Sequence, residues 1–511
     1  MSYAAIYSRA SVGIDAPLVS IEVHLANGIP SFTLVGLPET TVRESRERVR
    51  SALIQSGFEF PAKRIIVNLA PADLPKSGGR FDLAIAIGIL AASGQVDVSP
   101  HNRSLDQYEF LGELSLAGEV RPITACLPAV VAATKVDRMV FIAKQNKHES
   151  LLCRSARILC IESLAAVVEQ LITSKNHIFP SQDAEHFTDS VHQDVSDIIG
   201  QEQAKRALLI AAAGMHNLLF VGPPGTGKSM LAQRFTTLLP PLNEAQALES
   251  ATINSVKGNT LNNQNWYRRP FRNPHHSASL NAMVGGGSIP KPGEISLANH
   301  GVLFLDELPE FGRKVIDALR EPLETGDIQI SRANAKVTFP AQFQLVAAMN
   351  PSPTGDVHDG RTAPDQVIRY LNRISGPLLD RIDLQVEVNR QSLSDDRQQA
   401  SNQVSDRSTS KDLREKVLAS RQLQLSRQGC LNSQLYAGNI EQFCRLSESN
   451  NTFFLNALDK IGGSHRAMHR ILKVARTIAD LEGSAEIERV HLAEAMGYRA
   501  LETLIRQLSS C

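Results

Sequence analysis

The fold of the middle of this chain is decided by the stretch Gly222-Pro223-Pro224-Gly225-Thr226-Gly227-Lys228-Ser229. It matches G-x-x-x-x-G-K-[ST] at every fixed position. Residues 217–221 (NLLFV) before it predict a short buried strand, and the residues after Ser229 predict a helix. Glycines let backbone N–H groups surround phosphates, Lys228 would reach the β- and γ-phosphates, and the Ser229 hydroxyl would bind Mg²⁺. The segment therefore predicts an ATP site.

Two further strands carry candidate catalytic side chains. The apolar residues 302–305 are followed by Asp306 and Glu307. Asp306 would hold Mg²⁺, and Glu307 would polarise the attacking water as a general base. Residues 344–349 (QLVAAM) predict a third strand that ends at Asn350. This amide can orient the attacking water, although a turn-forming Asn before Pro is an equally good interpretation. The phosphate loop and the acidic strand together predict ATP hydrolysis.

Composition excludes several classes of protein. Lys+Arg and Asp+Glu both number 53, so the formal net charge is zero. That balance excludes a histone-like polycation but permits a local basic groove. The longest apolar run, residues 83–92, is far shorter than the ~20 residues of a membrane helix, and the N-terminus has no hydrophobic signal core. The six cysteines form no C-x-x-C pair, which predicts free thiols in a cytoplasmic protein without a membrane partner.

The 511-residue length and two polar stretches predict about three domains. Residues 174–197 are expected to be a linker and residues 391–410 a polar loop. Residues 1–173 mix strand and helix patterns, which indicates an α+β domain. Residues 198–390 alternate strands and helices, which indicates a largely parallel α/β sheet. Residues 411–511 show apolar positions at helical spacing, which indicates a helical bundle. In the first domain we expect strands at 19–25, 64–69 and 138–143, and helices at 39–57, 82–93 and 126–134.

These motifs, in this order, resemble the AAA+ ATPases. Residues 197–201 (DIIGQ) add to the match, because this position helps to seat the adenine in that superfamily. More narrowly, the chain resembles the magnesium-chelatase-like branch and, within it, the ComM/YifB family, from Ile14 to Arg506. The stretches that carry the resemblance are 272–276 (RNPHH), 285–296 (GGGSIPKPGEIS), 300–310 (HGVLFLDELPE), 375–384 (SGPLLDRIDL) and 463–480 (GSHRAMHRILKVARTIAD).

The resemblance implies further site residues and an assembly. Arg381 corresponds to an arginine finger, which would reach the γ-phosphate held by a neighbouring subunit. Arg466 corresponds to sensor 2, a second cation on the phosphates. From the residues alone, a surface or ion-paired arginine is the better interpretation of each. The implied architecture is a ring, expected to be a hexamer, of subunits with an AAA+ core and a C-terminal helical lid. Many members carry N-P-C-P-C-G after the Asn, but residues 350–355 read NPSPTG, so we expect no zinc.

The first domain resembles the proteolytic domain of Lon, which has the ribosomal S5 domain 2-like fold. The matching stretches are 75–82 (PKSGGRFD) and 112–133 (GELSLAGEVRPITACLPAVVAA). The Lon domain uses a Ser–Lys dyad. Here the nucleophile position falls at Arg80 and the lysine position falls near Leu127. We therefore expect this fold without peptidase activity, serving ring assembly or DNA guidance.

Candidate DNA contacts come from two segments. Residues 326–340 (GDIQISRANAKVTFP) predict a β-hairpin whose tip is flanked by Arg332 and Lys336. Residues 284–292 (VGGGSIPKP) form a loop with Lys291. The resemblance implies that such elements face the central channel of the ring, where cations would contact phosphates. A solvated hairpin or loop is the alternative. Residues 266–276 (WYRRPFRNPHH) suit either base stacking or a subunit interface.

Taken together, these features lead us to expect an ATP-driven, ring-shaped DNA motor. The resemblance implies helicase and branch-migration activity in homologous recombination, chiefly in the integration of transforming DNA. The expected partners are single-stranded and branched DNA, further copies of the chain, and recombination proteins. Three alternatives stay open: a metal chelatase motor, a protein unfoldase or protease, and an ATP switch that moves nothing. The DNA step rests on the resemblance, because AAA+ engines act on many substrates.

Overall fold

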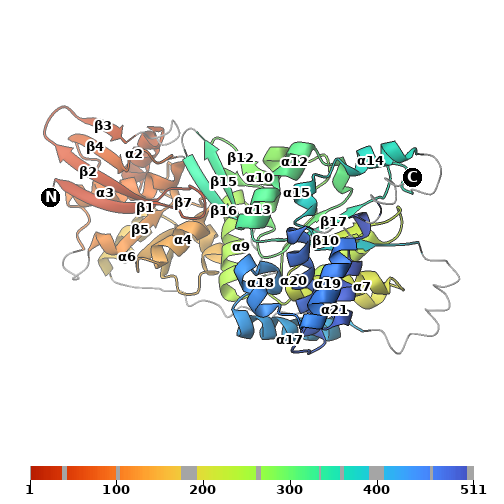
Figure 1. Cartoon of the computed structure of the whole chain (residues 1–511). Helices are drawn as coiled ribbons and strands as arrows, with labels where there is room; N and C mark the ends of the chain where they lie inside the picture. The colour runs from red at the N-terminus through yellow and green to blue at the C-terminus, as the bar shows by residue number, and fades with distance from the viewer. Residues whose placement is uncertain are drawn as a thin grey trace.

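A computed structural model shows how the three parts of the chain are arranged (Figure 1). The N-terminal part lies at one end, the phosphate-loop part follows it, and the C-terminal helices pack against the latter. A mixed α/β architecture with a helical C-terminal region is thereby confirmed. The structure describes residues 2–36, 43–76, 78–98, 104–173, 193–259, 266–332, 335–356, 362–390, 408–460, 464–502 and 504.

The N-terminal part is built on a mixed seven-stranded sheet with the order β3-β4-β2-β1-β5-β8-β9. The β1–β2 and β2–β4 pairs are antiparallel, and the other neighbours are parallel. The strands are β1 (Tyr3–Arg9), β2 (Leu18–Ala26), β3 (Ser31–Val35), β4 (Arg64–Ala70), β5 (Tyr108–Leu111), β8 (Met139–Ala143) and β9 (Ile158–Ile161), with a small hairpin of β6 (Glu113–Leu114) and β7 (Val120–Arg121). The helices are α2 (Ser45–Gln55), α3 (Asp82–Ser93), α4 (Cys126–Thr134), α5 (Lys147–Ser150) and α6 (Leu164–Thr173).

Two of the helices predicted in this part are confirmed with their bounds. The apolar run 83–92 forms α3, which packs on β1 and β2 and is buried along its whole length. A helix that is apolar all round needs such a site. The third prediction, 39–57, is shorter in the structure: α2 covers Ser45–Gln55, and residues 39–42 lie outside the described residues.

The middle part contains a five-stranded sheet with the order β11-β14-β17-β10-β18. Its strand pairs are parallel throughout, as the α/β pattern predicted. The strands are β10 (Leu218–Val221), β11 (Phe271–Arg272), β14 (Val302–Leu305), β17 (Gln344–Met349) and β18 (Leu384–Glu387). Because the strands are parallel, the carboxyl ends of β10, β14 and β17 meet at one edge of the sheet. Ligands of open α/β sheets bind at that edge.

Helices and two hairpins surround this sheet. The helices are α7 (Glu202–Gly214), α8 (Lys228–Leu238), α9 (Glu244–Lys257), α10 (Leu280–Val284), α11 (Glu294–Leu297), α12 (Arg313–Ala318), α13 (Arg320–Thr325), α14 (Pro364–Leu371) and α15 (Gly376–Leu379). The hairpins are β12 (Gly285–Gly286) with β13 (Lys291–Pro292), and β15 (Asp327–Arg332) with β16 (Ala335–Pro340). The second hairpin was predicted; its tip, 333–334, lies outside the described residues.

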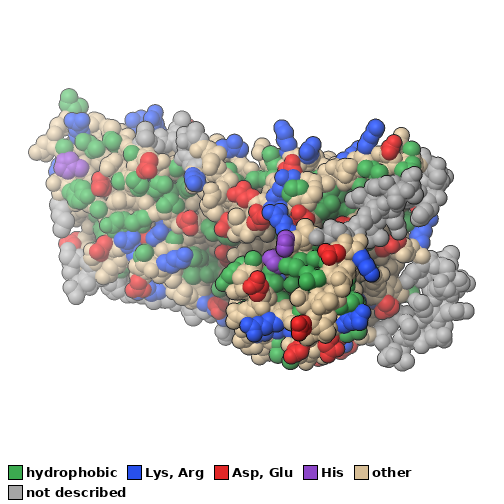
Figure 2. All heavy atoms as spheres, in the orientation of Figure 1, with side chains coloured by type: hydrophobic (Ala, Val, Ile, Leu, Met, Phe, Trp, Pro, Cys, Tyr) green, Lys and Arg blue, Asp and Glu red, His purple; other side chains and the backbone are tan. Residues whose placement is uncertain are grey.

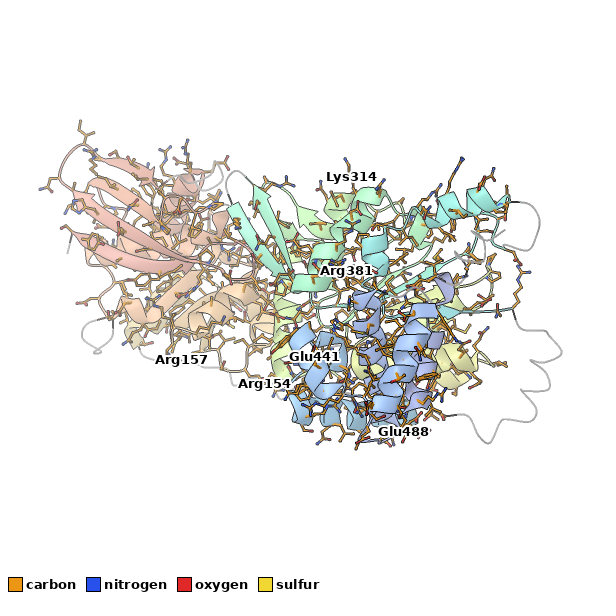
Figure 3. The ribbon with its side chains drawn as sticks, viewed as in Figure 1. Arg154, Arg157, Lys314, Arg381, Glu441 and Glu488 are labelled. Atoms are coloured by element: carbon orange, nitrogen blue, oxygen red, sulfur yellow. The ribbon has the colours of Figure 1, made fainter. Side chains whose placement is uncertain are left out.

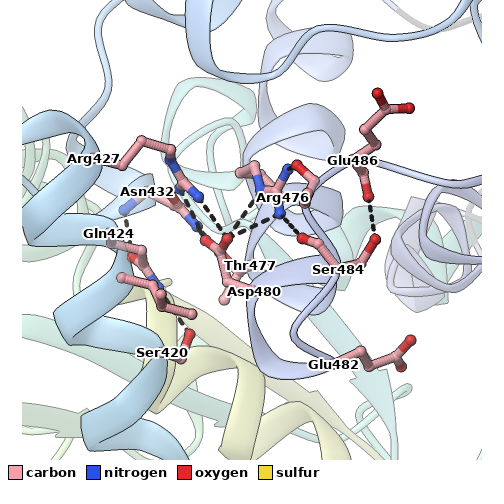
Figure 4. Close-up of polar contacts among 12 residues, drawn as sticks. Ser420, Gln424, Arg427, Asn432, Arg476, Thr477, Asp480, Glu482, Ser484 and Glu486 are labelled. Atoms are coloured by element: carbon pink, nitrogen blue, oxygen red, sulfur yellow. Dashed lines mark hydrogen bonds and ion pairs between the residues drawn. The ribbon is translucent and has the colours of Figure 1, made fainter.

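The C-terminal helices pack on α7 and α8 through α17 and α20 and share one apolar core with them. Figure 4 shows the polar network inside this bundle, centred on the buried Asp480. Arg427 donates to both of its carboxylate oxygens, at 2.6 and 2.9 Å, and Arg476 Nε donates to Oδ1 at 3.1 Å. Such a buried carboxylate is stable only because it is fully paired. The helices are α17 (Ser410–Gln428), α18 (Ala437–Phe443), α19 (Glu448–Lys460), α20 (His465–Leu481) and α21 (Arg489–Gly497).

The ends of the two predicted connecting segments meet in the structure. Residues 195–197 were assigned to the linker but form a short 3-10 helix, η5 (Val195–Asp197). Asp194 caps it, accepting from Ser196 N at 2.8 Å, and also accepts from Ser410 N at 3.0 Å. Ser410 Oγ in turn accepts from Val195 N at 2.9 Å. The middle part and the C-terminal helices therefore begin slightly earlier than residues 198 and 411. The reason is that the side chains of Asp194 and Ser410 satisfy backbone N–H groups at the start of both parts.

The N-terminal part is joined to the middle part through α4 and α9. An apolar cluster unites Leu127 and Val130 of α4 with Ala247 and Ala251 of α9 and with Trp266. Trp266 is 9% exposed. This burial argues against base stacking by Trp266, and the interface that covers it lies within one chain instead of between subunits. Among all the helices of the described ranges, none combines the length and hydrophobicity needed to span a bilayer.

Candidate nucleotide site

The phosphate loop, residues 222–227, connects β10 to α8 at the carboxyl edge of the sheet. All three of its glycines are required by the backbone. A Cβ on Gly222 would lie 2.1 Å from Val388 O, and Gly225 and Gly227 have φ values of 80° and 87°, which side chains rarely tolerate. A Cβ on Gly225 or Gly227 would meet no other atom within 4 Å, so space is open above the loop. The loop and the first turn of α8 thus form a cradle that fits phosphates.

Lys228 begins α8 and lies under this loop. Its Nζ donates to Gly222 O at 2.6 Å, to Pro223 O at 2.8 Å and to Asn350 Oδ1 at 3.2 Å. Burial lowers the pKa of Lys228, and the nearby Asp306 and Glu307 partly offset that effect. Asn350 therefore lies beside Lys228, at the end of β17 between the two other strands that carry the site.

Ser229 and Asp306 lie together, as Mg²⁺ ligation requires. Ser229 Oγ donates to Asp306 Oδ2 at 2.7 Å. A hydroxyl and a carboxylate at this distance, beside a phosphate cradle, fit an octahedral oxygen site for Mg²⁺. The second carboxylate oxygen of Asp306 accepts from Glu307 N at 3.0 Å. Ser229 and Asp306 are thus the residues that could hold the metal ion of a bound nucleotide.

Glu307 follows Asp306 in a left-handed backbone conformation, with a φ of 53°. Its carboxylate is half exposed and lies 3.1 Å from His276 Nδ1. A non-glycine residue in this region is uncommon, and such residues occur often at functional sites. His276 belongs to the stretch 272–276 (RNPHH), and the sequence alone indicates no catalytic role for it. The loop that carries it leaves β11, the strand beside β14, which is why the two side chains meet.

Arg381 lies at the other edge of the sheet from the phosphate loop. Its carbonyl accepts from Asn217 Nδ2 at 2.8 Å, and Asn217 precedes β10, whereas the loop follows β10. Arg381 likewise precedes β18, which runs parallel to β10. In Figure 3 Arg381 lies between α13 and α15 on one side and the C-terminal helices on the other. The arginine is thus placed away from the phosphates that its own loop would hold.

Arg466 lies at the same edge as Arg381. Its Nη1 is 3.9 Å from Asp380 Oδ2, and its side chain is 76% exposed. Arg466 is thus placed, like Arg381, away from the chain's own phosphate loop. Arg470, one turn along α20, fixes this placement by donating to Leu379 O at 2.9 Å and to Ile382 O at 3.1 Å. Its side chain is 13% exposed. Arg470 shows that this part of the polar face of α20 is a docking surface.

The three predicted DNA-contact cations lie on adjacent hairpins. A Cβ on Gly286 of β12 would lie 3.1 Å from Arg332 Nη2, and one on Gly285 would lie 3.0 Å from Ile330 Cδ1. Lys291 pairs with Gly286 across the smaller hairpin. Arg332, Lys336 and Lys291 are exposed. Figure 2 shows Lys and Arg side chains along this side of the molecule, over the hairpins, α12 and α14.

The N-terminal part covers one side of the larger hairpin. A Cβ on Gly13 would lie 2.6 Å from Val337 Cγ1, and Val12 and Ile14 pack against the same apolar cluster.

The two positions that correspond to the Lon dyad, Arg80 and Leu127, are close to one another. Arg80 Nη2 donates to Ala125 O at 3.3 Å, and Leu127 is buried two residues further on. Burial lowers the pKa of Arg80 to about 10.

The geometry defines a P-loop ATPase core of the AAA+ type, and three family models agree with it. "Subunit ChlI of Mg-chelatase" matches residues 21–146, "Magnesium chelatase, subunit ChlI" matches residues 194–396, and "Magnesium chelatase, subunit ChlI C-terminal" matches residues 407–499. The chain is therefore a magnesium-chelatase-like AAA+ protein, a class that implies ATPase activity with a nucleotide and Mg²⁺.

Relatives narrow this class. The chain is 56% identical to "Competence protein ComM" of Haemophilus influenzae, over 100% of both chains. It is 49% identical to a protein named YifB of Escherichia coli, over 99% of both chains. The match to "Magnesium-chelatase 38 kDa subunit" of Cereibacter sphaeroides is 27% over 38% of this chain and 58% of that protein. This chain belongs to the ComM/YifB family.

Proposed function

We propose that this protein is an ATP-driven DNA motor that works as a ring of identical subunits. It would move single-stranded or branched DNA as a helicase and branch-migration enzyme in homologous recombination. The relative named "Competence protein ComM" supports a place in the integration of DNA taken up during natural transformation. The proposed site of action is the cytoplasm.

One observation carries this proposal: the parts of the nucleotide site lie at opposite edges of one sheet. Lys228, Ser229, Asp306 and Glu307 are at the carboxyl edge, and Arg381 is at the amino edge. A head-to-tail contact between copies would bring the two edges together, and such contacts close into rings. Arg466 lies at the edge of Arg381 and would reach the same neighbouring nucleotide. A ring is therefore the assembly that completes the site.

Each side chain then has a defined role in hydrolysis. Lys228 would bind the β- and γ-phosphates, and Ser229 and Asp306 would hold Mg²⁺, which would neutralise phosphate charge. Glu307 accepts a proton from the attacking water, which Asn350 orients. Arg381 of the adjoining copy stabilises the charge that develops on the γ-phosphate. Because the arginine comes from another copy, hydrolysis depends on assembly.

The two adjacent hairpins support DNA as the substrate. They place three cations, Arg332, Lys336 and Lys291, on one exposed surface. These cations are carried by the two hairpins and not by an element that would read base edges. Such a surface contacts the phosphate backbone whatever its sequence, which a translocating motor requires. The Lon-like part adds no peptidase dyad, since Arg80 and Leu127 occupy its positions.

The test is ATP hydrolysis with no addition, with single-stranded DNA, with a branched duplex and with an unfolded protein. We expect DNA to raise the rate and Glu307→Gln to abolish it. Strand-displacement and branch-migration assays on the same preparation then measure the motor. Stimulation by unfolded protein and not by DNA would favour an unfoldase instead. Porphyrin metallation with added chelatase subunits would favour the chelatase reading.

A further inference from the structure

Arg381 is held within its own subunit by a carboxylate. Its Nη2 donates to Glu324 Oε1, and its Nη1 donates to Pro377 O. The Arg381 side chain is 17% exposed, whereas that of Glu324 is 61% exposed. Within the described part of the chain, the buried Nε of Arg381 has no hydrogen-bond partner. The guanidinium is thus turned toward Glu324 and is largely withdrawn from solvent.

Glu324 is built into the base of the larger hairpin. It lies in the last turn of α13, which ends at Thr325, and β15 begins at Asp327. Thr325 Oγ1 accepts from Asp327 N at 3.2 Å, and Gly326 between them has a φ of 76°. The end of β16 closes on the same point, because Ala341 N donates to Gly326 O at 2.6 Å. A displacement of the hairpin base therefore displaces Glu324.

We propose that Glu324 couples the β15–β16 hairpin to Arg381. It holds the arginine finger inside its own copy, and DNA that moves the hairpin releases Arg381 toward the neighbouring nucleotide. This inference rests on the proposed function, both for the role of Arg381 between copies and for DNA at the hairpin. Glu324 is a positioning residue, since it acts through Arg381 and touches no reacting atom.

The chemistry of the Arg381–Glu324 pair suits a contact in which Arg381 must exchange Glu324 for a phosphate held by another copy. An N–H group that donates to Glu324 does not donate at the same time to a phosphate of another copy. An ion pair with one partner mostly in solvent is weak, so a modest displacement is enough to break it. A phosphate offers Arg381 a stronger, doubly hydrogen-bonded partner once the guanidinium is released.

The experiment compares Glu324→Gln with Glu321→Gln, which removes the same charge from an exposed position of the same helix. ATP hydrolysis is measured without DNA and with saturating single-stranded DNA. We expect Glu324→Gln to raise the DNA-free rate about two- to five-fold, the factor that corresponds to a weak ion pair. The DNA-saturated rate stays that of the native protein, so the stimulation ratio falls. Glu321→Gln leaves both rates unchanged.

A double variant identifies the route of action. In the Arg381→Ala background, Glu324→Gln is expected to have no effect on the residual rate, and thermal melts confirm that each variant is folded. A DNA-free rate that is equal to or below the native rate overturns the proposal, as does a rise that persists without Arg381. A further outcome is that DNA fails to stimulate the native protein while Glu324→Gln still raises the rate through Arg381. That result would refute the proposed DNA motor and the coupling of the hairpin to Arg381. It would support only the proposal that Glu324 restrains Arg381.

Discussion

Two inactive variants of this protein should regain ATP hydrolysis when they are mixed. Glu307→Gln removes the proposed general base but keeps Arg381, and Arg381→Ala does the reverse. Because these groups lie at opposite edges of the sheet, each nucleotide site of the proposed ring would take them from two different copies. A site with Glu307 from an Arg381→Ala copy and Arg381 from a Glu307→Gln copy is complete.

The size of the recovery follows from the structure. β10 and β18 pair in parallel from Leu218↔Leu384 to Val221↔Glu387, a span of about 10 Å. Arg381 lies before that span and the phosphate loop lies after it, so each site of the proposed ring would draw its arginine from another copy. With random neighbours in an equal mixture, about one quarter of the sites are complete. Each variant alone should retain about one thousandth of the native rate or less.

The assay is phosphate release with ATP and Mg²⁺ at constant total protein, over a series of mixing ratios. Copies are exchanged beforehand by dilution and reconcentration, and energy transfer between labelled copies confirms the exchange. The rate should rise and fall symmetrically with the fraction of either variant and be greatest at the equal mixture. The double variant Glu307→Gln/Arg381→Ala, used in place of either partner, controls for dilution. A mixture that hydrolyses no faster than its two components, with exchange demonstrated, would refute the reasoning.

Three further predictions concern DNA, the domain interface and pH. Arg332→Ala/Lys336→Ala should weaken single-stranded DNA binding and reduce the slope of log K against log salt by about 1.4, as measured by fluorescence anisotropy, whereas Lys416→Ala on α17 should leave it unchanged. Ala251→Glu should cost the α4–α9 interface about 3 kcal/mol or more and shift the emission of Trp266, the single tryptophan, to longer wavelength, with far-UV circular dichroism unchanged. Burial raises the pKa of Asp82 to about 6, despite its pairing with Arg48. The folded state therefore binds the Asp82 proton more tightly than the unfolded state does, and this residue's contribution to stability falls by about 2 kcal/mol as pH rises from 4 to 6. Thermal melts over that range should show the decline in the native protein and a weaker one in Asp82→Asn; parallel curves would contradict it.

Local patterns predicted the features that depend on neighbouring residues alone. The phosphate loop needs glycines where the backbone turns or approaches Val388, and α3 needs an unbroken apolar run because every face of it is buried. Both requirements are written in consecutive residues. The parallel sheet likewise followed from the alternation of strand and helix patterns.

Features that depend on packing between segments far apart in the chain could not be predicted from the sequence. Arg470 looks like a surface residue by helical spacing, yet it docks α20 on the turn before β18. Trp266 looks like a stacking platform, yet it is covered by a helix that lies far earlier in the chain. The contact of His276 with Glu307 depends on β11 lying beside β14, and no periodicity predicts that neighbour relation.

The pairing of α4 with α9 has a consequence for how the protein is made. A ribosome that adds 5–20 residues each second completes α4 and then needs roughly 5–20 s to complete the roughly 110 residues that precede α9. Throughout that interval the nascent chain has no partner for Leu127 and Val130 on the α9 side. A chain that stalls between the two helices would present this apolar face to other nascent chains. Slow codons in this interval would therefore be a liability for the cell, and faster translation through it would favour soluble product.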